Sequence, residues 1–119
     1  MLFDSTILID FLNGIREARE AIIRSPRPAI SIITWIEVVS GGRTEAAEEV
    51  AKELLSTFSL LPLTGEVAGI AVTIWRERRL KLPDAVIYAT ALQNQLVLVT
   101  RNTWDFPRDD PTVVVPYQL

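Results

Sequence analysis

Short apolar stretches alternate with longer segments of helical pattern along the chain, and this alternation restricts the fold more than any other feature. We expect strands at residues 1–3, 28–31, 60–63, 96–99 and 113–115. The spacing of apolar residues between them predicts helices at 5–12, 15–24, 34–40, 45–58, 65–79 and 84–95. Strands that alternate with helices form a mostly parallel sheet with helices on both faces. The pattern therefore predicts a three-layer α/β/α fold with a five-stranded sheet, in a single domain over residues 1–119.

Local signals support these boundaries. Thr44 and Thr64 are predicted N-caps, and Pro83 stands at a helix start, where its missing N–H is not needed. Thr34 and Glu37 have the spacing of a capping box. The Gly-Gly-Arg-Thr segment at 41–44 lacks the spacing of a phosphate-binding loop, so a turn followed by a helix cap explains it.

Two residue types are absent from the chain. It contains no Cys, which excludes disulfides, thiolate nucleophiles and zinc–thiolate sites. It contains no His, which excludes Ser–His–Asp triads, histidine acid–base catalysis and histidine metal ligands. An enzyme with this composition must work with carboxylates, hydroxyl groups, cationic side chains or a metal ion held by oxygen atoms.

Four acidic residues are candidates for such a site. In an open parallel sheet, ligands bind beyond the carboxyl ends of the strands. Asp4 follows the first expected strand and Asp105 lies in the loop after the fourth, while the helix that begins near Asp84 can approach the same edge. Glu37 stands among large apolar residues, where a carboxylate needs a cation or hydrogen-bond donors.

Each of these acids also has a purely structural interpretation. Asp4 can cap a helix, Glu37 can complete the capping box, Asp84 can stabilise a helix start, and Asp105 can form an Asx turn. We expect Asp10 to have a supporting or surface role. The other acids, among them Asp109 and Asp110, have the pattern of solvated charge.

The convergence of the four acids is the stronger argument. Carboxylates gathered at one edge repel each other and raise each other's pKa values, unless a cation lies between them. Ligands that are all oxygen atoms favour Mg²⁺ or Mn²⁺ over zinc. Such an ion can activate water and stabilise charge on a phosphate, and either one or two ions are compatible with the sequence.

Four segments of the chain together resemble the PIN-domain ribonucleases, specifically the VapC-like toxins of type II toxin–antitoxin systems. They are FDSTILIDFL, SIITWIEVVSG, LKLPDAVIYATAL and LVTRNTWDF, in order from Phe3 to Phe106. The resemblance implies Mg²⁺- or Mn²⁺-dependent hydrolysis of RNA phosphodiester bonds. It implies metal-binding and catalytic roles for four acids: Asp4, Glu37, Asp84 and Asp105. It also implies supporting polar roles for Ser5, Thr100 and Asn102.

The resemblance further implies partners. VapC-like proteins form homodimers and are silenced by a cognate VapB-like antitoxin that covers the acidic site, often with an Arg. The basic cluster at the end of the fifth helical segment is a candidate RNA contact, with a solvated helix end as the alternative: Arg76, Arg78, Arg79 and Lys81. Trp104 either stacks on a base or fills the core, and Trp75 fits a core or a dimer interface.

Two other functions remain open at this point. One is a PIN-fold RNA-maturation nuclease without a toxin role, which the gene neighbourhood would distinguish. The other is a phosphoacceptor-type signalling module. Such a module needs paired acids after the first strand and a Lys near the last strand, but Ser5 follows Asp4 here, and the only lysines are Lys52 and Lys81.

No apolar stretch approaches the ~20 residues that cross a bilayer, and the N-terminus lacks the basic region of a signal peptide. We therefore expect a cytoplasmic protein without membrane contacts.

Overall fold

The computed structural model describes all 119 residues and contains one five-stranded sheet and six helices. The strands are β1 (Leu2–Phe3), β2 (Ala29–Ser31), β3 (Ser59–Leu61), β4 (Leu98–Val99) and β5 (Val113–Val114). The helices are α1 (Ser5–Leu12), α2 (Arg16–Arg24), α3 (Ile32–Ser40), α4 (Glu45–Leu55), α5 (Gly65–Arg78) and α6 (Leu82–Gln93). All strand pairs are parallel, in the order β3-β2-β1-β4-β5. The predicted α/β class and parallel sheet are confirmed.

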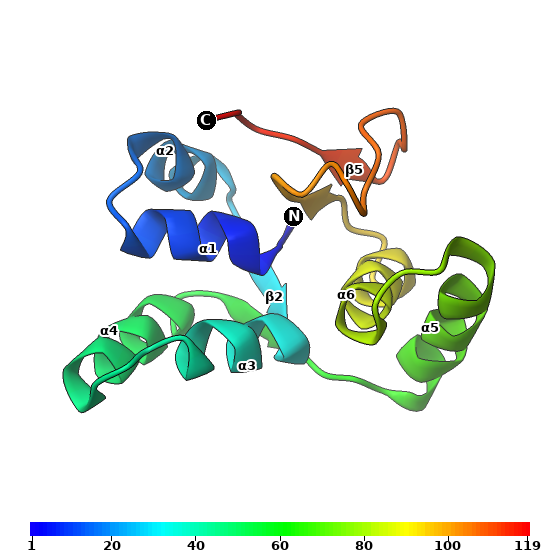
Figure 1. The fold of residues 1–119 in the computed structure, drawn as a ribbon, viewed down its shortest axis with the longest axis horizontal. Helices are drawn as coiled ribbons and strands as arrows, with labels where there is room; N and C mark the ends of the chain where they lie inside the picture. The colour runs from blue at the N-terminus through cyan, green and yellow to red at the C-terminus, as the bar shows by residue number, and fades with distance from the viewer.

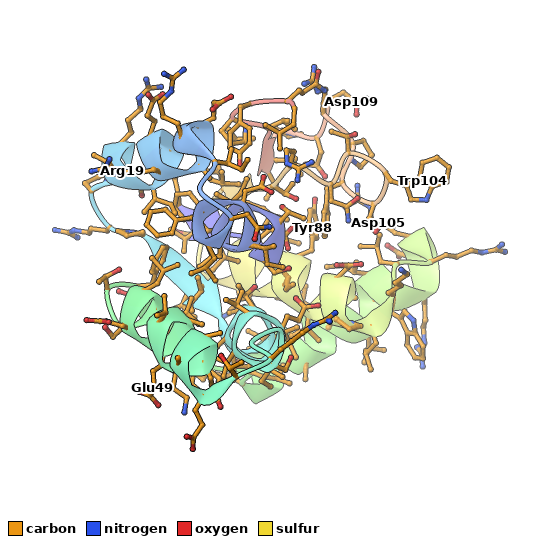
Figure 2. All side chains as sticks on the ribbon, turned by 60° about the vertical axis from the view of Figure 1, so that its left-hand side comes forward. Arg19, Glu49, Tyr88, Trp104, Asp105 and Asp109 are labelled. Atoms are coloured by element: carbon orange, nitrogen blue, oxygen red, sulfur yellow. The ribbon has the colours of Figure 1, made fainter.

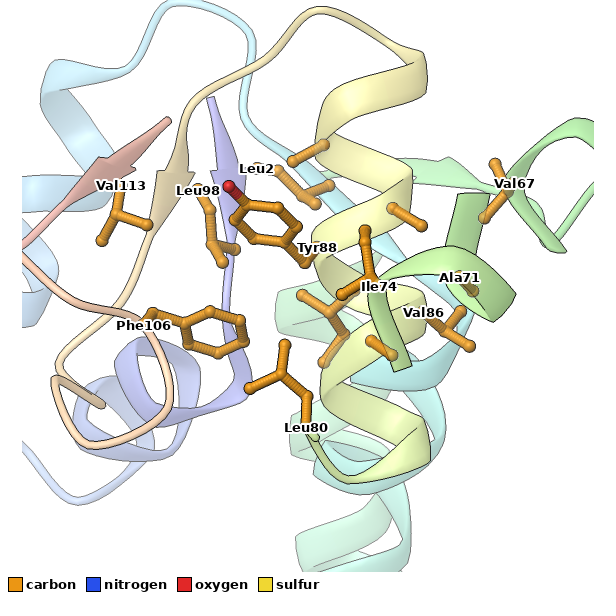
Figure 3. Close-up of a cluster of buried hydrophobic side chains, with 14 of the residues drawn as sticks. Leu2, Val67, Ala71, Ile74, Leu80, Val86, Tyr88, Leu98, Phe106 and Val113 are labelled. Carbon is orange, nitrogen blue, oxygen red and sulfur yellow. The ribbon is translucent and has the colours of Figure 1, made fainter. Parts of the chain in front are cut away.

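The sheet has a hydrophobic core on each face. Successive side chains of a strand point to opposite faces, and in β1 both Leu2 and Phe3 are 0% exposed. Leu2 packs with residues of α5 and α6, whereas Phe3 packs with residues of α1, α2, α3 and α4. Figure 1 shows these two groups of helices on opposite sides of β2, and Figure 3 shows the core on the α5–α6 side. The predicted three layers are therefore present.

Several predicted boundaries need correction. Helix α6 covers Leu82–Gln93 rather than 84–95, and β4 covers Leu98–Val99 rather than 96–99. Helix α3 begins at Ile32 rather than at Thr34, because Ser31 is the N-cap and its hydroxyl accepts a hydrogen bond from the Thr34 N–H at 3.1 Å. The predicted Thr34–Glu37 capping box is therefore wrong, and Glu37 lies inside the helix. Helix α4 ends at Leu55 rather than at residue 58, and β3 covers Ser59–Leu61 rather than 60–63.

Other local predictions are confirmed. The hydroxyls of Thr44 and Thr64 accept hydrogen bonds from the N–H groups of the third residue of their helices, at 3.0 Å and 3.2 Å. Gly14 has a φ of 81°, which glycine adopts without strain, and it follows the end of α1. None of the helices is long and apolar enough to span a membrane.

The topology brings three strand ends together. Strand β1 lies at the centre of the sheet between β2 and β4, and all three run in the same direction. Asp4 follows β1, α3 follows β2, and Thr100 follows β4. Residues far apart in the sequence therefore meet at one edge of the sheet, as the strand order requires.

Candidate active site

Asp4 is fixed directly after the central strand. It is 3% exposed, and its N–H donates to the Val99 carbonyl at 2.9 Å. Its Oδ2 accepts hydrogen bonds from Thr6 Oγ1 at 3.0 Å and from Thr100 Oγ1 at 2.7 Å. Asp4 occupies the N-cap position of α1, but its side chain makes no capping hydrogen bond. Helix capping therefore does not explain this buried carboxylate.

Glu37 approaches the same edge from α3. Burial is the largest influence on its carboxyl group and raises the pKa. The neighbouring Ser5 hydroxyl lowers the pKa and the negative charge of Asp4 raises it, so the net direction is upward. Glu37 Oε1 is buried and has no hydrogen-bond partner. A buried acceptor without a donor is costly, and a bound cation would satisfy it.

Asp84 lies in the first turn of α6, where the helix dipole favours a negative charge. The pKa of Asp84 is nevertheless raised to about 6. Burial is the largest cause, followed by the charges of Asp105, Asp4 and Glu37 and by a side-chain hydrogen bond with Asp105. Burial and the charges of the three other acids therefore raise the pKa of Asp84 although the helix dipole favours its ionised form.

Asp105 is held in the loop after β4. Its Oδ2 accepts a hydrogen bond from Asn102 Nδ2 at 2.9 Å, and its N–H donates to Asn102 Oδ1 at 3.3 Å. The next residue, Phe106, is fully buried and stacks on Tyr88 of α6 with the ring centroids 6.0 Å apart. This contact anchors the loop against α6, one turn after Asp84, as Figure 3 shows for the two rings.

The three other predicted acids thus lie within electrostatic reach of Asp84, since each of them raises its pKa. They do not form a complete metal cage, because no group of three acidic side chains has the geometry to hold an ion as the side chains stand. The acids therefore converge on Asp84, but their side chains are not arranged as a finished metal site.

The three predicted supporting residues each contact one acid. Ser5 contacts Glu37, Thr100 contacts Asp4, and Asn102 contacts Asp105. Thr6, which bonds Asp4, was missed by the sequence analysis, although its position two residues after Asp4 is the signal that could have found it. Asp10 is 6% exposed and forms an ion pair with Arg101, which excludes the surface role.

The candidate RNA contacts have different surroundings. Trp104 is 93% exposed, which rules out the core interpretation, and Figure 2 shows it projecting from the molecule beside Asp105. Arg78 Nη2 forms an ion pair with Asp110 at 3.1 Å, and its guanidinium lies 4.7 Å from the centre of the Tyr88 ring. The other three cations are exposed: Arg76, Arg79 and Lys81. Asp110 also accepts from Tyr88, so its predicted solvation is wrong.

The chain is similar to known proteins over most of its length. A model of the PIN domain family matches residues 1–108. Ribonuclease VapC10 from Mycobacterium tuberculosis is 35% identical over 115 residues, which are 90% of this chain and 86% of that protein. A chain of a toxin–antitoxin complex from Klebsiella pneumoniae is 44% identical, with a TM-score of 0.92 over 99% of this chain and 98% of that chain. FitAcB from Neisseria gonorrhoeae, at 24% identity, has the same fold, with a TM-score of 0.82 over 99% of both chains.

Proposed function

This chain belongs to the PIN domain family, and we propose that it is a ribonuclease and the toxin of a VapBC-type toxin–antitoxin pair. The observation that best supports a catalytic site is the pKa of Asp84, raised to about 6 by burial and then by Asp105, Asp4 and Glu37. Four carboxylates from four parts of the chain converge at one edge of the sheet. The fold itself does not require these carboxylates to lie close together. Cleavage of RNA by the purified protein, and its loss in Asp84→Asn, tests the proposal.

The residues fit a hard divalent cation such as Mg²⁺ or Mn²⁺. The available donors are carboxylate oxygens, which these ions prefer. The buried Glu37 Oε1 lacks a partner, and the acids repel each other in the absence of a positive charge. The residues that would hold the ion are Asp4, Glu37, Asp84 and Asp105. When bound, the ion supplies positive charge and Lewis acidity to a phosphodiester.

The chain's own residues provide position and charge for this reaction. Thr6 and Thr100 fix the carboxylate of Asp4, and Asn102 fixes that of Asp105. These hydrogen bonds hold the acids in place before the substrate arrives, so less reorganisation is needed during the reaction. Hydrolysis then joins a water oxygen to phosphorus and breaks the bond between phosphorus and the leaving oxygen, which takes up a proton.

Trp104 is proposed as a stacking surface for an RNA base. An exposed indole next to the acidic edge presents a flat face, and stacking on one base contributes ~1–3 kcal/mol. We expect Trp104→Ala to raise the KM for RNA about tenfold with little change in kcat. Trp104→Phe should retain most of the affinity, and neither variant should change the Tm, because the side chain is exposed. An unchanged KM in Trp104→Ala, measured in steady-state cleavage, argues against stacking.

Arg76, Arg79 and Lys81 complete the proposed RNA surface. Arg78 is left out because it forms an ion pair with Asp110.

We also propose a homodimer that uses an apolar groove between α5 and the start of α6. The groove is lined by Ile33, Leu63, Ala68, Ala71, Val72, Trp75, Leu82, Pro83 and Val86. Trp75 and Leu82 are 51% and 55% exposed, which is unusual for large apolar residues grouped in one place. Pro83 in this lining directly precedes Asp84, so the groove lies beside the residue that carries the candidate site.

The dimer is tested by placing a charge in this groove. We expect the wild-type protein to elute as a dimer, and Trp75→Glu to elute as a monomer in size-exclusion chromatography with light scattering. Ile23→Glu, which changes a 68% exposed residue on α2, should leave the dimer intact. A monomeric wild type, or a dimeric Trp75→Glu, contradicts the interface.

The toxin role implies an antitoxin partner and places the protein with cellular RNA in the cytoplasm. Asp84 and Asp105 are partly exposed, so a partner segment with a cationic side chain can reach the acidic edge from their side. A small antitoxin-like reading frame found just upstream of the gene would support this role. Its absence favours an RNA-maturation nuclease with the same chemistry.

A further inference from the structure

Arg101 links the candidate site to the first helix and to the end of the chain. Its Nε and Nη2 atoms donate to the two carboxylate oxygens of Asp10, at 2.7 Å and 2.9 Å. The Tyr117 hydroxyl donates to Asp10 Oδ2 at 2.7 Å. Asp10 is thus bonded by residues 91 and 107 positions away in the sequence. A two-pronged Arg–carboxylate pair of this kind is among the strongest and most directional contacts in proteins.

The same residue is connected to the acids through its backbone. The Arg101 N–H donates to Thr6 Oγ1 at 3.2 Å, and Thr6 Oγ1 donates to Asp4 Oδ2 at 3.0 Å. On either side of Arg101 are Thr100, which bonds Asp4, and Asn102, which bonds Asp105. The Asn102 N–H also donates to Thr100 Oγ1 at 3.0 Å. A continuous set of contacts therefore runs from Tyr117 to two of the four acids.

Asp10, at the centre of this group, is buried and bonded to a cation. Asp10 is 6% exposed, and the hydrogen bond from Arg101 is the largest of the effects that keep its pKa below the ordinary value. A buried carboxylate of this kind is costly without its cation, so Arg101 has one strongly preferred position. The backbone of residues 100–102 is held with it.

We propose that Arg101 is a positioning residue for the acidic site, and that Tyr117 at the end of the chain holds Arg101 in place through Asp10. The proposal rests on the proposed function, because it concerns the same cation site. It assigns a role to residues other than the four acids. One of them, Tyr117, lies outside residues 1–108, the range that matches the family model. The C-terminal segment after β5 is therefore part of the support of the site.

The chain contains a matched control for this proposal. Tyr88 and Arg78 both bond Asp110, in a second Tyr–Asp–Arg group. The side-chain hydrogen bonds of Asp110 go to Arg78, Tyr88 and the Thr112 N–H, and none reaches the four acids. Tyr88→Phe and Tyr117→Phe therefore remove the same chemical contact, and Tyr88→Phe keeps the ring that stacks on Phe106.

The test compares Arg101→Lys, Tyr117→Phe and Tyr88→Phe with the wild-type protein. Isothermal titration with Mn²⁺ should show about tenfold weaker binding for Arg101→Lys, because residues that orient metal ligands contribute about 10–100-fold. Tyr117→Phe should show a smaller loss of about threefold, and Tyr88→Phe none. In RNA cleavage, kcat should fall in the first two variants while KM stays unchanged.

A second readout needs neither the metal nor activity. In EDTA, hydrogen exchange at the Arg101 and Asn102 amides should be faster in Arg101→Lys and Tyr117→Phe than in Tyr88→Phe, although both Tyr variants lower the Tm by similar amounts. Wild-type exchange rates and wild-type Mn²⁺ binding in Arg101→Lys overturn the proposal, as does an equal loss of Mn²⁺ binding in Tyr88→Phe. If the folded wild-type protein neither binds Mn²⁺ nor cleaves RNA, the proposed function fails, and the positioning proposal fails with it.

Discussion

The Asp84→Asn variant is expected to be more stable than the wild-type protein in EDTA at pH 7, and to cleave RNA at least about 100-fold more slowly in Mn²⁺. The loss of activity follows from removing a cation ligand, since even residues behind the ligands contribute about 10–100-fold. The gain in stability follows from removing one of four mutually repelling charges. Thermal unfolding in EDTA and a single-turnover cleavage assay measure the two effects.

The sign of the stability change comes from the pKa of Asp84. Because it rises to about 6 in the folded state, from 3.8, the folded protein binds the proton more tightly than the unfolded chain. Stability must therefore fall as the pH rises from about 4 to above 6. Asp84→Asn lacks this dependence, so its advantage in Tm should be largest above pH 7 and should shrink towards pH 5. Burial and then the three neighbouring acids cause the shift, so the effect reports their convergence.

Asp109→Asn is the matched control for this variant. Asp109 is an exposed aspartate in the loop after Asp105, so the same substitution removes one charge without touching the acidic edge. We expect wild-type activity and a nearly unchanged Tm. Undiminished turnover in Asp84→Asn would falsify the catalytic assignment. An Asp84→Asn protein that is inactive but less stable in EDTA would contradict the repulsion between the acids.

The sequence was sufficient to predict most of the fold and the location of three acids. The alternation of apolar runs and helical segments is a long-range pattern, and it led to the parallel sheet with helices on both faces. In such a sheet, chain order alone places Asp4 and the Asp105 loop after neighbouring strands. Pro83 then marked the start of the helix that carries Asp84.

Glu37 and the supporting contacts were harder to predict, for two physical reasons. Ser31 and Thr34 both carry a hydroxyl that can cap a helix, and local sequence does not decide between them, so Glu37 was also compatible with a capping box. The bonds of Asp10 with Arg101 and Tyr117, and of Asp110 with Arg78 and Tyr88, join distant parts of the chain. Such pairs form only through the tertiary packing, and no short sequence pattern indicates which distant residues will bond.

Mn²⁺ at about 100 times its dissociation constant should raise the Tm of the wild-type protein by about 10 °C at pH 7. A ligand at this concentration contributes about 2.7 kcal/mol to stability, and a chain of this size gains roughly 3–4 °C per kcal/mol. EDTA should abolish both this shift and RNA cleavage, and added Mn²⁺ or Mg²⁺ should restore them. The shift should be smaller at pH 5, because Asp84, with a pKa of about 6, then binds a proton in place of the cation; the raised pKa of Glu37 acts in the same direction.

A comparison of Glu37→Gln with Glu53→Gln distinguishes Mn²⁺ binding at a specific site from nonspecific attraction of Mn²⁺ to an acidic protein. Each variant removes one negative charge, but Glu37 contributes the buried unpaired oxygen, whereas Glu53 is exposed on α4. We expect Glu37→Gln to lose most of the Mn²⁺-dependent increase in Tm, and Glu53→Gln to retain it. Equal increases in the two variants, or cleavage that persists in EDTA, would mean that the four acids do not share a cation. The acids would then repel each other without a compensating ligand, and the upward pKa shift of Asp84 would have no functional explanation.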